Sequence, residues 1–344
     1  MHVGSRWGCQ VDVLSDTLRV LRLSGSVFFT ARFGSPWAFL SPPAGDMAQF
    51  LGLSSDCVTP FHVLVEGNCS IEMENHQTIE VSGGDVVIFP HGAAHVMGSG
   101  QQTTPLLLST LLPPLSSGRI PVVEVDGPGE VTRFICGFLQ CDRQFNPLLG
   151  ALPNAMVVTN RTRASNGDGR ARSGERAAVI HPGEWIDVTV RQTMEEADRG
   201  DQGNIVMLGR LAEILFVEVL RRYMQELPPT QPGWLTGVKD PVVGQTLGLL
   251  HASPERDWTV DELARAAAVS RSTLSDRFTL LIGEPPMRYL TRWRMQLAQH
   301  LLRQTDLSIA AVATRVGYAS EVAFSHAFKR YIGQPPVSWR LSEF

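Results

Sequence analysis

Cysteine is scarce in this 344-residue sequence, and its spacing excludes one common kind of metal site. The five cysteines are Cys9, Cys57, Cys69, Cys136 and Cys141, and no two of them form a CxxC pair. A zinc site built on CxxC pairs is therefore excluded. In a cytosolic protein we expect these cysteines to be reduced thiols.

The sequence also lacks an apolar run long enough to cross a membrane, which needs about 20 residues. The longest such run, 205–220, is interrupted by Arg210, Glu213 and Glu218. The first ten residues contain no apolar core of signal-peptide length. We therefore expect a cytoplasmic protein without a membrane partner.

Net charge is small, −4 overall, but it is distributed unevenly. Residues 238–344 carry 13 basic and 10 acidic side chains, a net charge of +3, so the remainder carries −7. A chain of this length is long enough for two domains. The difference in charge suits one module that binds nucleic acid and a second module that does not.

An internal duplication lies in the basic part of the chain. Residues 259–286 and 308–336 each read as a helix, a short turn and a second helix. The second helices correspond at an offset of 50 residues, so that Phe278 aligns with Phe328. Such self-similarity indicates a repeated supersecondary unit.

The local signals in each copy are those of a helix-turn-helix. Ala268 and Gly317 mark the turns, and Ser270 and Ser320 stand where each second helix would begin, a position that favours serine. In this motif the second helix enters the major groove of DNA. A plain helical bundle is the alternative. Six arginines against two acidic residues over 271–303 favour DNA, because DNA presents phosphates.

The duplicated stretch resembles the DNA-binding domain of the AraC/XylS family of bacterial transcription regulators. The matching residues are Leu263, Ala264, Val269, Ser270, Leu274, Phe278, Gly283, Pro286, Tyr289, Arg294, Ala298, Leu301, Leu302, Ile309, Ala313, Gly317, Tyr318, Phe324, Phe328, Lys329, Gly333, Pro336 and Arg340. Trp339 stands where the family usually has tyrosine. The resemblance implies an all-α double helix-turn-helix domain over 242–344 that binds double-stranded promoter DNA.

The exposed residues near the start of each second helix are the candidates for reading bases, because these positions enter the groove first. We expect Arg271 to bind guanine and Glu321 to accept from a cytosine amino group. Arg277, Lys329 and Arg330 lie late in their helices and are expected to hold phosphates. The predicted DNA-binding residues are Arg271, Ser272, Ser275, Arg277, Ser320, Glu321, Val322, Ser325, His326, Lys329 and Arg330.

Short runs of Val, Ile and Phe predict an all-β region, sandwich or barrel, in the N-terminal part. The clearest predicted strands are 61–65, 69–73, 78–81 and 86–89. The segment GDVVIFPHGAAH over 84–95 matches the second cupin motif, and the first motif is only partly present. Residues 12–150 thus resemble the cupin-type sensor domains of AraC-family regulators, which implies a domain that binds a small effector.

In cupins the histidine and glutamate positions of these motifs hold a metal. His62 and Glu66 keep the His-x3-Glu spacing, and His91 and His95 lie in the predicted loop. These four ligands would suit one divalent transition metal such as Zn, Fe or Ni. In a straight strand His62 and Glu66 would be about 13 Å apart, so joint ligation needs a bend. The alternative is that these groups line a pocket or satisfy buried backbone atoms.

Cys136 and Cys141 allow a second kind of sensing. Across a tight turn they could approach closely enough for a disulfide, which would make a redox-sensing regulator. The alternative is that they are two small core residues, as free cysteines usually are. The polar, arginine-containing segment 160–176 is expected to be a mobile loop rather than a nucleic-acid arm, because it lacks apolar anchors.

Three helices are predicted around the β region, over 12–22, near 185–194 and over 203–225. The apolar face of the last either packs on the β region or pairs with a second copy in a homodimer. Residues 151–226 are thus assigned to the loop and these helices. The Pro- and Gly-rich stretch 227–241 is expected to be the interdomain linker.

The predicted fold is multidomain, with an N-terminal all-β cupin-like barrel with flanking helices and a C-terminal all-α double helix-turn-helix. The predicted function is an effector-controlled, sequence-specific transcription regulator, not an enzyme, that acts as a homodimer and contacts RNA polymerase. A cupin-fold metal-dependent enzyme with an accessory DNA-binding module is the alternative. It would need three or four good ligands, and the first cupin motif is eroded.

Overall fold

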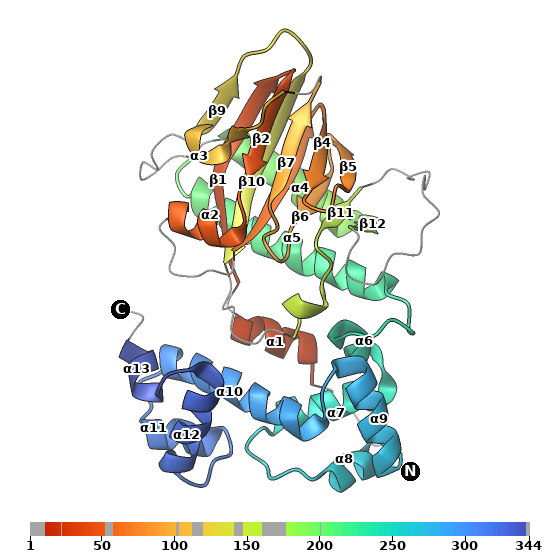
Figure 1. Cartoon of the computed structure of the whole chain (residues 1–344), viewed down its shortest axis with the longest axis vertical. Coiled ribbons are helices and arrows are strands. Elements are labelled where there is room, and N and C mark those ends of the chain that lie inside the picture. Colours follow the sequence, from red (N-terminus) through yellow and green to blue (C-terminus); the bar gives the residue numbers. More distant parts are fainter. Residues whose placement is uncertain are drawn as a thin grey trace, which may run out of the picture. The chain divides into compact units, whose positions relative to one another are not determined.

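A computed structural model describes residues 11–21, 23–51, 58–100, 103–111, 120–140, 147–159, 177–199 and 201–341. The chain forms two compact units (Figure 1). The β unit comprises the described residues within 22–143 and 152–227. The helical unit comprises those within 1–21, 144–151 and 228–344.

The β unit is built from twelve strands among its described residues. They are β1 (Ser24–Gly34), β2 (Trp37–Ser41), β3 (Val58–Glu66), β4 (Asn68–Met73), β5 (Thr78–Ser82), β6 (Val86–Ile88), β7 (His95–Ser99), β8 (Leu106–Leu107), β9 (Val122–Val125), β10 (Val131–Gln140), β11 (Met156–Val158) and β12 (Ala178–Ile180). The order β12-β11-β6-β3-β10-β1-β9 makes one sheet, and β5-β4-β7-β2-β8 makes the other. The four clearest strands predicted from the sequence are confirmed as β3 to β6.

An aromatic core lies between the two sheets. Phe33 of β1 and Phe134 of β10 come from the larger sheet, and Trp37 and Phe39 of β2 come from the smaller one. The rings of Phe33 and Phe134 meet edge to face with centroids 5.3 Å apart, and Phe39 stacks on Phe134 at 5.7 Å. This geometry is favourable for aromatic pairs. The core therefore joins the sheets into one cupin-type β unit.

Helices α2 (Ala44–Leu51), α3 (Leu108–Leu111), α4 (Glu184–Arg199) and α5 (Asn204–Glu226) flank the strands. Helix α5 crosses β1 where Gly209 meets Gly25, and a Cβ on Gly209 would lie 2.5 Å from the Gly25 carbonyl oxygen. Leu208, Leu215 and their neighbours on this face of α5 are buried. This face of α5 therefore packs within the β unit.

The helical unit contains α1 (Val13–Leu21), a 3-10 turn (Leu149–Ala151), α6 (Trp234–Lys239), α7 (Pro241–Ala252), α8 (Val260–Ala266), α9 (Arg271–Ile282), α10 (Pro286–Gln304), α11 (Ile309–Arg315), α12 (Glu321–Ile332) and α13 (Pro336–Leu341). The two predicted helix-turn-helix copies are confirmed as α8–α9 and α11–α12. Their turns adopt positive φ, 55° at Ala268 and 82° at Gly317. The duplication thus extends to backbone conformation.

Two boundaries differ from the expected domains. The predicted linker 227–241 contains helix α6, which is folded because Trp234 and Leu235 are buried in the helical unit. The indole of Trp234 donates a hydrogen bond to the Tyr289 hydroxyl at 3.2 Å. At the other end of the chain, α1 packs against α7 and α10 and so belongs to the helical unit rather than to the β unit.

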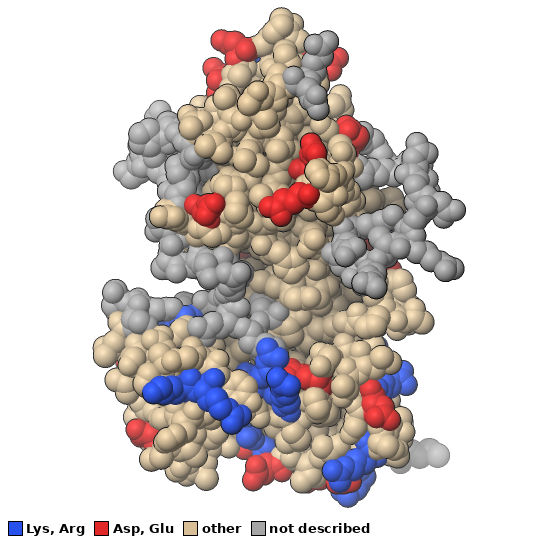
Figure 2. Space-filling model, viewed as in Figure 1, with Lys and Arg blue, Asp and Glu red and all other residues tan. Residues whose placement is uncertain are grey.

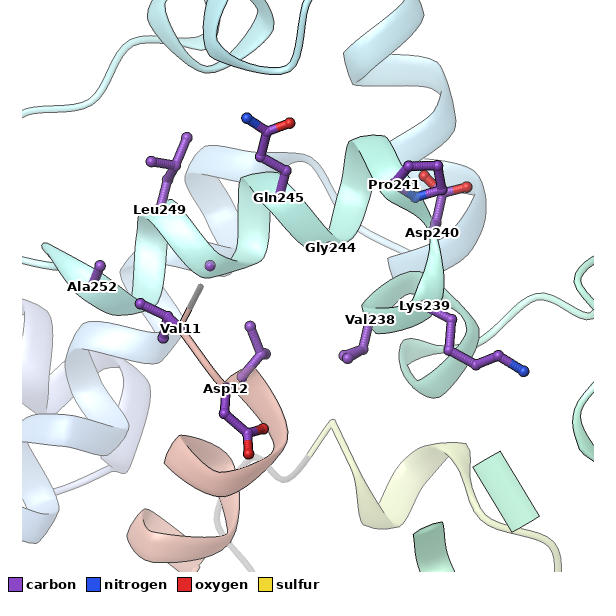
Figure 3. A pocket seen from close by; sticks show the side chains of 12 residues that line it. Val11, Asp12, Val238, Lys239, Asp240, Pro241, Gly244, Gln245, Leu249 and Ala252 are labelled. Atoms are coloured by element: carbon purple, nitrogen blue, oxygen red, sulfur yellow. The ribbon is translucent and has the colours of Figure 1, made fainter. Parts of the chain in front are cut away.

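A cavity of about 760 Å³ opens where the start of α1 faces α6 and α7 (Figure 3). Gly244 and Gly248 leave space along α7, and Val11, Val238 and Leu249 surround it. A glycine is needed at position 244, because a Cβ there would lie 2.4 Å from the Val238 carbonyl oxygen. The glycine that allows α6 to approach α7 closely therefore also leaves part of this cavity open.

Candidate nucleic-acid interface and the buried histidine pair

Helices α9 and α12 begin at serine caps. The Ser270 hydroxyl accepts the Thr273 backbone N–H at 3.1 Å, and the Ser320 hydroxyl accepts that of Ala323 at 3.2 Å. Each cap satisfies a backbone donor that would otherwise lack a helical partner. Ser320, one of the predicted DNA-binding residues, is thus engaged as a cap.

The first turns of both helices are accessible. The predicted base-reading residues are exposed, or half-buried in the case of the two inner serines: Arg271, Ser272, Ser275, Glu321, Val322, Ser325 and His326. Val322 is a large apolar side chain that is 67% exposed. The opposite faces are buried, through Leu274 and Phe278 in α9 and through Phe324 and Phe328 in α12. Each helix therefore presents one face to a partner.

Arg271 is held only weakly by its own chain. Its guanidinium lies 3.2 Å from the Asp261 carboxylate, and both side chains are more than half exposed. An exposed ion pair of this kind contributes about 0–1 kcal/mol. Arg271 can therefore exchange Asp261 for another acceptor.

Arg277 is placed differently from its predicted phosphate role. Its Nε and one terminal nitrogen donate to a single Asp240 carboxylate oxygen at 2.8 and 2.5 Å. Asp240 lies at the start of α7, and its side chain is only 9% exposed. The arginine therefore fastens α9 to α7, a partner that the sequence reading missed.

Lys329 and Arg330 are exposed, as their predicted role requires. Arg330 lies beside the Tyr331 ring, with its guanidinium carbon 5.1 Å from the ring centroid. Lys329 follows Val322 by seven residues and Ser325 by four, so all three share one face of α12. Lys329 thus lies nearer the base-reading residues than its late position suggests.

Helix α10 joins the two reading helices through packing on both sides. Trp293 stacks on His251 of α7 with centroids 3.8 Å apart, whereas Ala298 and Leu302 belong to the core around α12. Arg294 donates to the backbone carbonyls of Pro254 at 2.6 Å and Arg256 at 2.9 Å. Helix α10 thus packs against the part of the helical unit that precedes α8 as well as against the core of the second helix-turn-helix.

The two units differ in the charge of their surfaces. On the face shown in Figure 2, basic side chains gather over the helical unit, together with some acidic ones. The charged side chains visible over the β unit on this face are chiefly acidic. The basic surface suits phosphate, as the uneven net charge predicts.

A histidine pair is buried in the β unit. His62 of β3 and His95 of β7 are 1% and 2% exposed, and their Nε2 atoms lie 2.8 Å apart. His95 Nδ1 lies 2.9 Å from the Ala93 carbonyl oxygen, and His62 Nδ1 lies 2.7 Å from the Cys136 sulfur. Because a carbonyl oxygen only accepts, His95 Nδ1 carries a proton and its Nε2 accepts from His62. The Cys136 thiol then donates to His62, which completes a chain of neutral groups.

Burial explains why this chain is neutral. It lowers the pKa of His95 to about 4, with an opposing contribution from the Ala93 carbonyl, and it lowers the pKa of His62 well below its usual value. Burial also raises the pKa of the Cys136 thiol, and nearby Cys69 raises it further. A thiol with a raised pKa is a poor nucleophile and metal ligand. Cys141, the predicted redox partner of Cys136, lies outside the described residues, as does the segment 160–176.

The four predicted metal ligands are not brought together. Glu66 is exposed at the end of β3, and His91 Nε2 lies 3.0 Å from the Leu152 carbonyl oxygen. In the described part of the chain, no three His, Cys, Asp or Glu side chains are grouped so that they could hold a metal. Two histidines remain, fewer than the three or four protein ligands of a typical site.

Two further polar atoms are buried on β2, one at each end of the strand. Ser41 pairs with His95 across β2 and β7, and Trp37 lies at the other end of β2. The Ser41 hydroxyl and the Trp37 indole N–H have no hydrogen-bond partner within the described structure. Buried polar groups normally have partners, so both atoms are available to water or to a small molecule.

Comparison with known proteins extends these observations. The profile of a cupin family matches residues 12–172 and 175–225, and that of a helix-turn-helix domain matches 263–342. An AraC-like transcription regulator of Streptomyces lividans is 30% identical over 96% of this chain and 98% of its own length. The transcriptional regulator AlkR of Acinetobacter baylyi is 28% identical over 96% of this chain and 99% of its own.

A solved structure, the DNA-binding domain of AdpA in complex with a target DNA, is 35% identical, with a TM-score of 0.28. It covers 30% of this chain and 92% of that domain. Among the helices that the structure describes, none has the length and apolar composition needed to span a membrane. The relatives named above are transcription regulators, not enzymes. This chain belongs to the AraC family of DNA-binding helix-turn-helix transcription regulators, with an N-terminal cupin domain.

Proposed function

We propose that this regulator reads an asymmetric promoter sequence of two short blocks, one with α9 and one with α12, under the control of a small effector. The observation that carries the proposal is the pair of capped helices, which one helix, α10, connects on both sides. Because α10 is continuous, the two helices would enter one face of the DNA about a turn apart, roughly 34 Å.

The side chains at the helix starts suit particular bases. Arg271 can donate two hydrogen bonds to guanine, and Glu321 can accept from the amino group of cytosine. Val322, 67% exposed, can contact the methyl group of thymine. Lys329 and Arg330 supply positive charge for phosphates at the second block.

Arg271→Ala tests this assignment by binding of the full-length chain to randomised DNA sites. The loss of one guanine contact should cost about 1–3 kcal/mol and relax the preference at one base pair of the first block only. Arg265→Ala is the matched control, because Arg265 is exposed on α8 and its substitution removes the same charge. The control should weaken binding to all sequences equally. If Arg271→Ala does the same, Arg271 contacts the phosphate backbone and not a base.

We further propose that the effector binds inside the β unit beside Ser41, His62 and His95. The unsatisfied Ser41 hydroxyl supplies a hydrogen bond beside the histidines, the Trp37 indole offers a second one at the far end of β2, and the core between them is aromatic. The histidine chain is neutral, and burying a charge without a partner is costly. The effector should therefore be an uncharged molecule with an aromatic or aliphatic body and at least one hydrogen-bonding group.

Thermal unfolding of the full-length chain with a panel of phenols and the matched benzoates tests this class of ligand. Uncharged phenols should raise the unfolding temperature, because a ligand that binds only the folded state stabilises it. Ser41→Ala should remove this shift, whereas Ser70→Ala, a half-buried serine on β4 that bonds to Gly98, should retain it. Equal shifts in both variants would exclude Ser41 from the site.

A homodimer is part of the proposal. Helices α4 and α5 expose large apolar side chains, Trp185 at 70%, Val206 at 67%, Met207 at 52% and Ile214 at 47%. The other face of α5 is buried within the β unit, so these residues are free to meet a second copy. We also propose that the protein works in the cytoplasm and contacts RNA polymerase at the promoter.

A further inference from the structure

Asp240 connects the end of α6 to the start of α7, and its carboxylate is fully engaged. One carboxylate oxygen accepts the backbone N–H groups of Val242 and Val243, each at 3.0 Å. The other oxygen accepts two N–H groups of Arg277 in α9, at 2.8 and 2.5 Å. Charge-assisted bonds of this kind are short and directional. The pair therefore fixes a specific orientation between α7 and α9.

Arg277 lies on the side of α9 away from its base-reading face. It follows Ser275 by two residues, which places it about 160° around the helix at roughly 100° per residue. Arg271, Ser272 and Ser275 form the exposed face, and Leu274 and Phe278 form the buried one. The arginine thus occupies the flank next to α7.

The apolar contacts of α9 and the ion pair restrain different motions. Phe278 packs edge to face on Tyr289 of α10, with centroids 5.8 Å apart, and this contact sets how deeply α9 is seated. Apolar contacts are less directional than hydrogen bonds, so the bonds between Asp240 and Arg277 are suited to restrain rotation of α9 about its axis. In the second copy the residue that corresponds to Arg277 is Ala327, so this restraint belongs to the first copy alone.

We propose that Asp240 is a positioning residue for DNA reading. Through Arg277 it sets the angle at which α9 presents Arg271, Ser272 and Ser275 to the major groove. This inference rests on the proposed function, in which α9 reads the first block.

Asp240→Asn separates positioning from simple electrostatics by the sign of its effect. Asparagine is as good an N-cap as aspartate, so α7 keeps its start, but Arg277 loses its charged acceptor. Electrostatics alone predicts tighter binding to DNA, because a negative charge is removed. Positioning predicts weaker binding to the best site, by about tenfold, with loss of preference confined to the first block.

The experiment measures binding of the full-length chain to a library of randomised two-block sites. Asp261→Asn is the matched control: it removes the same charge from the exposed pair with Arg271 and should leave binding unchanged or tighter. Binding by Asp240→Asn that is as tight as wild type, with wild-type preference in the first block, overturns the inference. Absence of base preference in the wild type would instead overturn the proposed function.

Arg277→Gln gives a second measurement, at a side chain that is 47% exposed and tolerates substitution. If the pair acts as a unit, this variant should reproduce the effect of Asp240→Asn, and the double variant should be no weaker than either single one. If Arg277 instead holds a phosphate, its loss should weaken all sequences evenly, flatten the salt dependence and add to the effect of Asp240→Asn. An even loss with a flatter salt dependence in Arg277→Gln alone would overturn the inference even if Asp240→Asn failed to fold.

Discussion

The stability of the helical unit should depend on pH through His251. This histidine is 6% exposed, stacks on Trp293 and lies 2.8 Å from the Tyr289 hydroxyl through its Nε2 atom. Because Trp234 donates to the same hydroxyl, the tyrosine proton is directed to His251 Nε2. Protonation of His251 would remove this acceptor and leave a charge buried between α7 and α10.

The magnitude follows from the pKa of His251, which burial lowers from 6.5 to about 3. Because the pKa is lower in the folded protein than in the unfolded chain, only the unfolded chain binds a proton between the two values. The free energy of unfolding is therefore highest above pH 6.5 and decreases as the pH falls below 6.5. Between pH 7 and pH 5, linkage between protonation and folding gives a loss of about 2 kcal/mol in the free energy of unfolding. The loss should continue as the pH falls further toward 3.

Urea unfolding of the wild type and of His251→Phe at pH 7, 6 and 5 tests this reasoning. Phenylalanine keeps the stacking on Trp293 but leaves the Tyr289 hydroxyl without its acceptor, at a cost of about 1 kcal/mol. The wild type should therefore be more stable at pH 7, and His251→Phe more stable below about pH 6. Other titrating groups, such as His95, affect both proteins equally. Parallel dependence on pH in the two proteins would refute the assignment.

Three further outcomes are expected. Val206→Asp should yield a monomer by sedimentation, because it places a charge in the proposed dimer face; an unchanged dimer would move the interface elsewhere. Gly317→Ala should destabilise the helical unit by at least about 2 kcal/mol in thermal unfolding, since its φ is 82° and a Cβ would lie 2.8 Å from the Glu255 backbone. The control Gly248→Ala, with no atom within 4 Å of its Cβ, should stabilise α7 by about 1 kcal/mol. Arg330→Ala should weaken DNA binding evenly and lower the salt dependence, and a change of preference at single bases would contradict its phosphate role.

The helical unit was largely predictable because its signals are local. Serine caps, turn residues and apolar spacing specify where each helix begins and which face it buries, and the duplication doubles the evidence. The same holds for strands β3 to β6, whose alternation or apolar runs are bounded by glycine turns. The base-reading residues stay a prediction, since their exposure is observed but their contacts with DNA are not.

Residues whose partners are distant in sequence were predicted less well. Arg277 was assigned to phosphate from its late position in α9, but its acceptor Asp240 lies 37 residues earlier, in the expected linker. His62, Glu66, His91 and His95 were grouped by motif spacing, yet only the two residues on facing strands, His62 and His95, meet. Trp234 reads as a linker residue because its burial depends on α9 and α10, which follow later in the chain.

The sequence by itself determined the family, the two kinds of domain and the faces of the reading helices, because periodicity, caps and turns act over a few residues. Only the tertiary structure decided which polar groups meet in the interior. The chain from Cys136 through His62 to His95 forms where β10, β3 and β7 bring three side chains together. Asp240 meets Arg277 because α7 packs against α9. Such contacts depend on the register of strands and the crossing of helices, which no single stretch of sequence encodes.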